Sequence, residues 1–149
     1  MASAGLLDRQ GHRLIQLGAA LFLLTSLEGL AIESFAVPML GRSVHTLAGL
    51  SGVVLIALGL IWPRLRLSQT AAAVAFWTLI YSTLATITDF LLAALWRAGA
   101  SVIPLAAQGA RGTPVQETVL QAIAYTAGPT ALVAFGLILW GLRGLPQSR

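Results

Sequence analysis

The chain has 149 residues, of which 57% are hydrophobic and 9% are charged; because soluble domains carry about 25% charged residues, this composition excludes a water-soluble enzyme, and it is too apolar for a disordered chain. The nine basic residues are all arginine, and with five acids they give a formal net charge of +4. There is no cysteine, which excludes disulfides, iron–sulfur clusters and thiolate nucleophiles.

Four apolar runs are long enough to cross the hydrocarbon core of a bilayer, which takes about 20 helical residues. In chain order they cover residues 14–32, 43–63, 71–95 and 118–142. The connections are short except for residues 96–117, whose glycines and prolines are typical of a loop. Because the runs are continuous rather than alternating, they favour helices over a barrel. The sequence therefore predicts an all-α, integral membrane four-helix bundle, with residues 1–149 as one membrane domain.

The arginines are divided unequally between the two sides that these spans define. Cytoplasmic segments carry the excess of arginine in membrane proteins, so the richer side is expected to be cytoplasmic and to hold both termini. Arginines placed in this way between apolar runs act as topology signals, and we expect no nucleic-acid partner. The richer side holds Arg9, Arg13, Arg64, Arg66, Arg143 and Arg149, and the other side holds Arg42, Arg97 and Arg111.

Ionisable and polar side chains inside the spans are the first candidates for function. An ionisable group in a span costs roughly 2.5–3.5 kcal/mol and usually faces the bundle interior. Glu28, His45, Asp89 and Tyr125 come from four different spans at a similar depth near the outer side. We therefore expect these four side chains to converge. The alternative is that the acids bond across helices for structure and that the histidine is an interfacial residue.

The third span carries a polar face. Thr78, Ser82, Thr86 and Asp89 follow one another at intervals of four, four and three residues, which places them within about 80° of one another on a helix. Tyr81 borders this face. We interpret Asp89, Thr86 and Tyr81 as candidate catalytic groups, together with Glu28 and Tyr125. Alternatively, such hydroxyls bond only to their own backbone.

The second span combines a lone histidine with small residues. Ala48, Gly49 and Gly52 would let a neighbouring helix or a flat ligand approach the backbone closely. One histidine with an open opposite side is how a five-coordinate haem is held, and a b-type haem needs no cysteine attachment. A non-haem metal held by His45, Asp89 and Glu28 is the alternative.

Short matches to a known family extend over about three quarters of the chain. They are Gly11-His12 before the first span, His45 and Gly52 in the second span, Pro63 at its end, and Ala127-Gly128-Pro129 in the fourth. In these positions the chain resembles the bacterial styrene oxide isomerases, small four-span enzymes of aromatic degradation. The resemblance implies a multi-pass protein of the bacterial inner membrane.

The resemblance also implies a cofactor and an assembly. Members of this family are trimers that hold ferric haem b at subunit interfaces, with an axial histidine at the position of His45. The iron acts as a Lewis acid on an epoxide, which rearranges to a carbonyl compound. The family's asparagine maps onto Ser51 and its tyrosine onto Phe90. The expected haem contacts are therefore His45 as metal ligand, with Gly49, Ser51, Gly52 and Phe90.

The sequence thus favours an epoxide isomerase with haem b, acting as a homo-oligomer on a small hydrophobic substrate among membrane lipids. Because Phe90 lacks the family's hydroxyl, Asp89 is the expected replacement on the substrate side. Two alternatives stay open. One is a membrane haem- or lipid-binding protein without catalysis, and the other is a metal-free enzyme of the sterol-isomerase type that uses Glu28 and Asp89.

Overall fold

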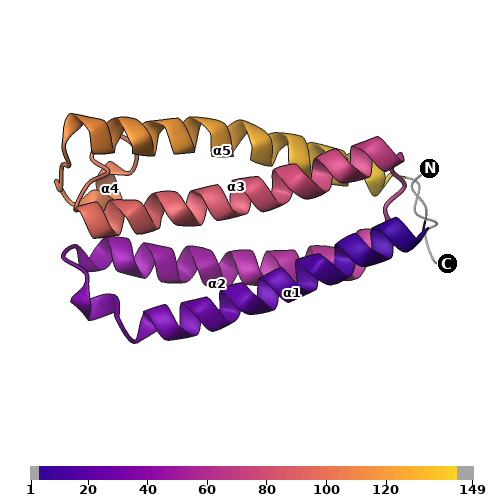
Figure 1. Cartoon of the computed structure of the whole chain (residues 1–149), viewed down its shortest axis with the longest axis horizontal. Helices are drawn as coiled ribbons and strands as arrows, with labels where there is room; N and C mark the ends of the chain where they lie inside the picture. The colour runs from indigo at the N-terminus through magenta and orange to yellow at the C-terminus, as the bar shows by residue number, and fades with distance from the viewer. Residues whose placement is uncertain (1–3, 144–149) are drawn as a thin grey trace.

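The computed structural model describes residues 4–143, and its long elements are all helices. In chain order they are α1 (Ala4–Gly29), the 3-10 turn η1 (Ile32–Ser34), α2 (Pro38–Ile61), the 3-10 turn η2 (Trp62–Arg64), α3 (Gln69–Trp96), α4 (Pro104–Ala107) and α5 (Pro114–Gly141). Figure 1 shows four long helices side by side, with the short α4 at the end where α3 connects to α5. The predicted all-α class is confirmed.

Three helices among the described residues are long and apolar enough to cross a membrane, and they indicate an integral membrane protein. They are α2 extended through η2 (Pro38–Arg64), α3 and α5. Helix α1 is not among them, although it has 26 residues. Its first half carries Asp8, Arg9, His12 and Arg13, and it ends at Gly29, short of the predicted end at residue 32. Three of the four predicted spans are thus supported by length and composition.

Local sequence signals explain where the helices begin and end. Helix α2 begins at Pro38, five residues before the predicted span, because proline suits the first helical turn and a charged residue such as Arg42 does not interrupt a helix. Helix α5 begins with a capping box, in which Thr113 and Gln116 bond reciprocally. Helix α3 ends where Arg97 takes the left-handed conformation, with φ 54°.

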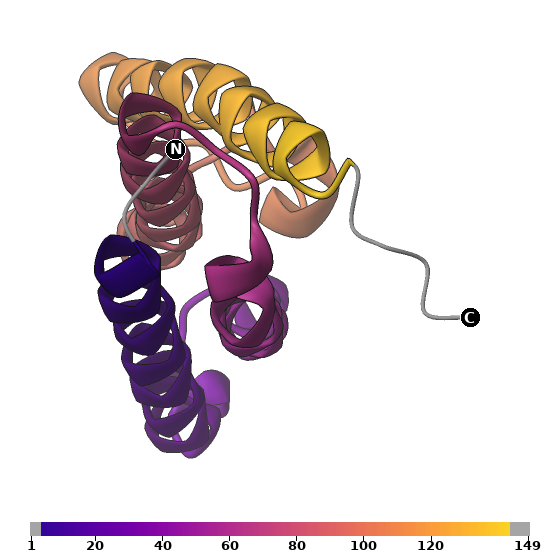
Figure 2. The ribbon, with the colours of Figure 1, turned by 90° about the vertical axis from the view of Figure 1, so that its right-hand side faces the viewer.

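The helices form two antiparallel pairs. Helix α1 packs mainly on α2, α5 packs mainly on α3, and α2 joins the pairs through α3 (Figure 2). Glycines seven residues apart bring α1 and α2 together. A Cβ on Gly18 would lie 2.6 Å from the carbonyl oxygen of Gly52, and a Cβ on Gly11 would lie 2.6 Å from that of Gly59. Since only glycine fits at this separation, these four positions fix how α1 and α2 are rotated against each other.

The start of α1, the turn η2 and the end of α5 lie at one end of the bundle, and η1 and α4 lie at the other (Figure 1). The amide of Arg66 donates to the carbonyl of Gly141 at 2.9 Å, and Trp62 is fully buried there, where its indole donates to Gln10 Oε1 at 3.0 Å. This end carries the arginines predicted to be cytoplasmic, except that Arg149 lies outside the described residues. Which end faces the cytoplasm stays a prediction.

Candidate functional site

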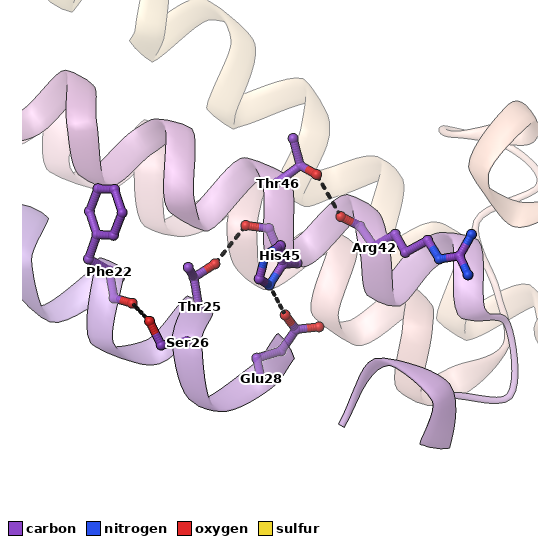
Figure 3. Close-up of polar contacts among 7 residues, drawn as sticks. All are labelled: Phe22, Thr25, Ser26, Glu28, Arg42, His45 and Thr46. Atoms are coloured by element: carbon purple, nitrogen blue, oxygen red, sulfur yellow. Dashed lines mark hydrogen bonds and ion pairs between the residues drawn. The ribbon is translucent and has the colours of Figure 1, made fainter. Parts of the chain in front are cut away.

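His45 and Glu28 meet at the contact between the end of α1 and the start of α2. The Nδ1 atom of His45 lies 3.2 Å from Oε2 of Glu28 (Figure 3). The Glu28 side chain is only 10% exposed, and both of its oxygens are buried, as is Nδ1 of His45. Two of the four side chains expected to converge are therefore in contact, and their polar atoms are enclosed by the two helices.

Two neighbours on α1 shape the seat of the imidazole. A Cβ on Gly29 would lie 2.9 Å from Cε1 and 3.1 Å from Nδ1 of His45, so the ring occupies space that only glycine leaves open. The hydroxyl of Thr25 donates to the backbone carbonyl of His45 at 2.6 Å (Figure 3). Gly49 follows on the next turn of α2 and also faces Thr25. Thr25, Glu28 and Gly29 thus form one cradle, which the sequence showed only through Glu28.

The other nitrogen of His45 is on the open side of the ring. The His45 side chain is 41% exposed. Within residues 4–143 its Nδ1 atom is buried, whereas its Nε2 atom is not among the buried atoms and forms no hydrogen bond. Metal-bound histidines typically use one nitrogen for the metal and give the other to a carboxylate. The donor set at His45 therefore fits an axial haem ligand.

Asp89 does not join this pair. It is 3% exposed, and its Oδ1 atom has no hydrogen-bond partner in the described part of the chain. On the α3 helix it lies about 20° from Ser82, which lines a cavity together with residues of both α2 and α5. Asp89 is therefore buried inside the bundle, and it is not grouped with Glu28 and His45.

The alternative of a non-haem metal held by three side chains is consequently wrong. Among the described residues, no three histidine or acidic side chains lie close enough together to hold a metal ion. Glu28 and His45 meet between α1 and α2, whereas Asp89 is buried on α3 and is not grouped with them. Their similar depth does not bring them together.

A cavity of about 200 Å³ opens between α2, α3 and α5. Two predicted site residues, Ser51 and Thr86, lie there together with Thr83. The hydroxyls of these three residues form no hydrogen bond within the described residues. Those of Thr78 and Ser82 instead bond to backbone carbonyls of their own helix, as the alternative interpretation of the polar face predicted. The cavity is lined by Leu50, Ser51, Val54, Ser82, Thr83, Thr86, Ala131 and Phe135.

A second hollow of about 350 Å³ lies along α2 nearer to η1. Phe90 of α3 lines it, together with Met39, Arg42, Ser43, Thr46 and Leu47 of α2. Both hollows lie along the contact between α2 and α3, and we call them together the hydroxyl groove. It holds Ser51, Thr86 and Phe90, three of the residues predicted to border a cofactor or substrate.

His45 and the hydroxyl groove lie on different sides of α2. Ser51 follows His45 by six residues, which places the two about 120° apart around the helix. Leu47 and Leu50, which line the groove, are about 160° and 140° away from His45. His45 therefore lines neither hollow of the hydroxyl groove.

The remaining predicted residues lie elsewhere. Tyr81 and Thr126 are joined by a hydrogen bond of 2.7 Å, and Tyr125 is 75% exposed on α5. The structure therefore does not bring Tyr125 to the Glu28–His45 pair. Gly52 serves helix packing, because a Cβ there would lie 2.9 Å from the carbonyl oxygen of Gly18.

Glu117 is an organising acid that the sequence reading did not single out. Its carboxylate accepts hydrogen bonds from the amides of Gly99 and Gly112 at 3.0 and 2.9 Å, and from the amide and hydroxyl of Ser101. It thereby holds the connection from α3 to α5 in a closed form. In the sequence, its position as an acid in the first turn of a helix, after a glycine-rich loop, could have indicated this role.

Comparisons with known proteins agree on one family. A family model described as styrene oxide isomerase matches residues 10–143, which confirms the resemblance found in the sequence. Hydroxylaminobenzene mutase HabB of Ectopseudomonas oleovorans is 42% identical over 93% of this chain and 84% of its own length. Hydroxylaminobenzene mutase HabA of the same organism is 37% identical over 84% of this chain and 93% of its own length. No solved structure matches.

Proposed function

Because this chain belongs to the styrene oxide isomerase family, we propose that it is an integral-membrane mutase that rearranges a small aromatic hydroxylamine. The family and the two relatives indicate an isomerase or mutase. The observation that carries the choice of substrate is the 42% identity to a hydroxylaminobenzene mutase over 93% of the chain.

The proposed reaction is an isomerisation that needs no external oxidant or reductant. The N–O bond of the hydroxylamine breaks and a C–O bond to the ring forms. The hydrogen displaced from that ring carbon leaves as a proton, and the nitrogen gains one, so the aminophenol has the same atoms as the substrate. Epoxide rearrangement is related chemistry, because a polarised bond to oxygen breaks there too.

We assign ferric haem b to this enzyme, and His45 would hold the iron through Nε2. The support is the exposed Nε2 edge, the carboxylate beside Nδ1 and the space left by Gly29. When bound, such a haem supplies a Lewis acid that polarises the substrate oxygen. The chain itself supplies the axial nitrogen.

The hydroxyl groove is the proposed substrate surface. The hydroxyls of Ser51, Thr83 and Thr86 are available to bond a hydroxylamino group, since none bonds within the described residues. Leu50 and Phe135 supply apolar contact for the ring. Asp89 is not among the residues that line the groove, so the proposal gives the substrate contacts to these hydroxyls.

A homo-oligomer is part of the proposal, because His45 and the hydroxyl groove face different sides of α2. A second copy would bring its own groove to the His45 of the first. Large apolar side chains such as Leu50, Leu60 and Leu132 are exposed on the single chain, which suits burial against lipid or another copy. A closed ring of identical contacts gives a cyclic oligomer, and the trimer expected from the family is one such ring.

Turnover by the purified protein in lipid nanodiscs tests the function. Hydroxylaminobenzene and styrene oxide are offered separately, and aminophenol and phenylacetaldehyde are measured by chromatography. Aminophenol formation supports the proposal. Conversion of styrene oxide alone supports the second candidate, an epoxide isomerase, which the family description favours. Haem binding without either product would support the non-catalytic alternative and overturn the proposed function.

A further inference from the structure

Glu28 is a buried acid whose side chain faces a single polar partner. Its Oε2 atom lies 3.2 Å from Nδ1 of His45, within ion-pair distance, and neither of its oxygens forms a hydrogen bond within the described residues. Burying a carboxyl group with so little compensation is costly. Within the described residues, the approach to His45 is the one polar contact of this carboxyl group, so a role for Glu28 is expected to act through His45.

The contact makes the two imidazole nitrogens inequivalent. A neutral imidazole carries one proton, and a carboxylate beside Nδ1 favours the form with the proton on Nδ1, because the carboxylate only accepts hydrogen bonds. The lone pair then resides on Nε2, the nitrogen on the open side of the ring. We propose that Glu28 is a positioning residue that holds His45 in the Nδ1–H tautomer and presents Nε2 to the haem iron.

The surrounding backbone holds the ring where Glu28 can act on it. Gly29 leaves the space that the ring edge occupies, and the Thr25 hydroxyl fixes the His45 carbonyl on the same side of α2. A carboxylate on the distal nitrogen also raises the donor strength of a metal-bound histidine. The tautomer of His45 is a property of the chain alone, so only the statement that Nε2 faces the haem iron rests on the proposed function.

Glu33 provides a matched control close to Glu28. Its Oε1 atom lies 3.3 Å from Arg42, but both side chains are largely exposed. Exposed pairs of this kind contribute little. The substitution E33Q removes one carboxylate near the same end of the bundle and should leave His45 unchanged.

The first experiment needs no haem. The chain has two histidines, so ¹⁵N-histidine NMR in an H12Q background reports on His45 alone, and the two ring nitrogens distinguish the tautomers. The wild-type chain and E33Q should show mainly Nδ1–H. E28Q, which can donate as well as accept, should raise the Nε2–H fraction by about threefold or more. Equal tautomer fractions in E28Q and the wild type would overturn the inference.

The second experiment uses the haem-loaded protein. The iron–histidine stretching frequency should fall in E28Q and the haem potential should become more positive, because the axial nitrogen loses donor strength. E33Q should match the wild type in both. If E28Q does not fold, E28M, which has a similar length, is measured in its place.

The two experiments separate this inference from the proposed function. A tautomer change in a chain that never takes up haem would retain the role of Glu28 and refute the haem assignment. Normal haem uptake with an unaltered tautomer, stretching frequency and potential in E28Q would refute the role of Glu28 and leave the haem assignment standing.

Discussion

Glu28 of α1 and His45 of α2 are in contact through Oε2 and Nδ1, 3.2 Å apart, at the end of the bundle where α1 gives way to η1. The pair lies beside Gly29 and Thr25, and the exposed edge of the imidazole carries Nε2. Among the described residues it is the one N···O pair of ionisable side chains within 4.0 Å that joins two of the long helices.

Replacing His45 with alanine should abolish haem binding, because the proposal gives the iron one protein ligand. The purified H45A protein should be folded and monodisperse but lack the Soret absorption band of the wild type. H12A is the control, since His12 lies in the first half of α1 among charged residues. A normal haem spectrum in H45A would show that another residue binds the iron.

The substitution Gly29→Ala should weaken haem binding about tenfold, equivalent to about 1.4 kcal/mol. The added Cβ would lie 2.9 Å from Cε1 of His45 and would push the ring out of its seat. Haem titration measures the affinity. Gly136→Ala is the matched control, because a Cβ there meets nothing within 4 Å. Equal affinities in the two variants would contradict the importance of the cradle.

Gly18→Ala should destabilise the whole bundle rather than one site. Its Cβ would lie 2.6 Å from the carbonyl of Gly52, and overpacking of this kind typically costs about 1–3 kcal/mol. The thermal midpoint of the protein in detergent should therefore drop, and Gly136→Ala should leave it nearly unchanged. A thermal midpoint equal to that of the wild type would show that α1 and α2 can move apart at Gly18 without loss of stability, which would contradict the prediction.

Thr86→Val should lower kcat/KM on hydroxylaminobenzene by about tenfold while leaving the haem spectrum intact, because it removes one hydroxyl from the groove and keeps its shape. Thr78→Val is the control on the same helix. The Thr78 hydroxyl bonds to the carbonyl of Val74 at 2.7 Å and is not available to a ligand. The assignment of the groove fails if both variants retain full activity.

Mixing two inactive variants tests whether one site is built from two copies. Co-expressed H45A and T83V/T86V chains should recover activity, because in each mixed cyclic trimer one interface of the three would pair an intact histidine with an intact groove. Purified hetero-oligomers carrying two affinity tags are compared with each variant alone. If each site instead takes its histidine and its groove from the same copy, every site in the mixture lacks one of the two, and the activity should not recover.

The sequence by itself determined the class of the protein and the longest elements. Apolar length and the need to satisfy the backbone in lipid are local properties, so three spans and the all-helical fold could be read directly from residues 43–63, 71–95 and 118–142. Residue type also singled out His45 and Glu28, since ionisable groups are rare in such segments. Position along each span predicted their common depth.

Only the tertiary structure decided which of the equally deep residues meet. Depth follows from position in the sequence, but the direction of a side chain depends on how its helix is rotated against its neighbours. On α1 and α2 that rotation is set by the close contacts of Gly18 with Gly52 and of Gly11 with Gly59. It turns Glu28 toward His45, whereas Asp89 of α3, at a similar depth, does not meet either of them.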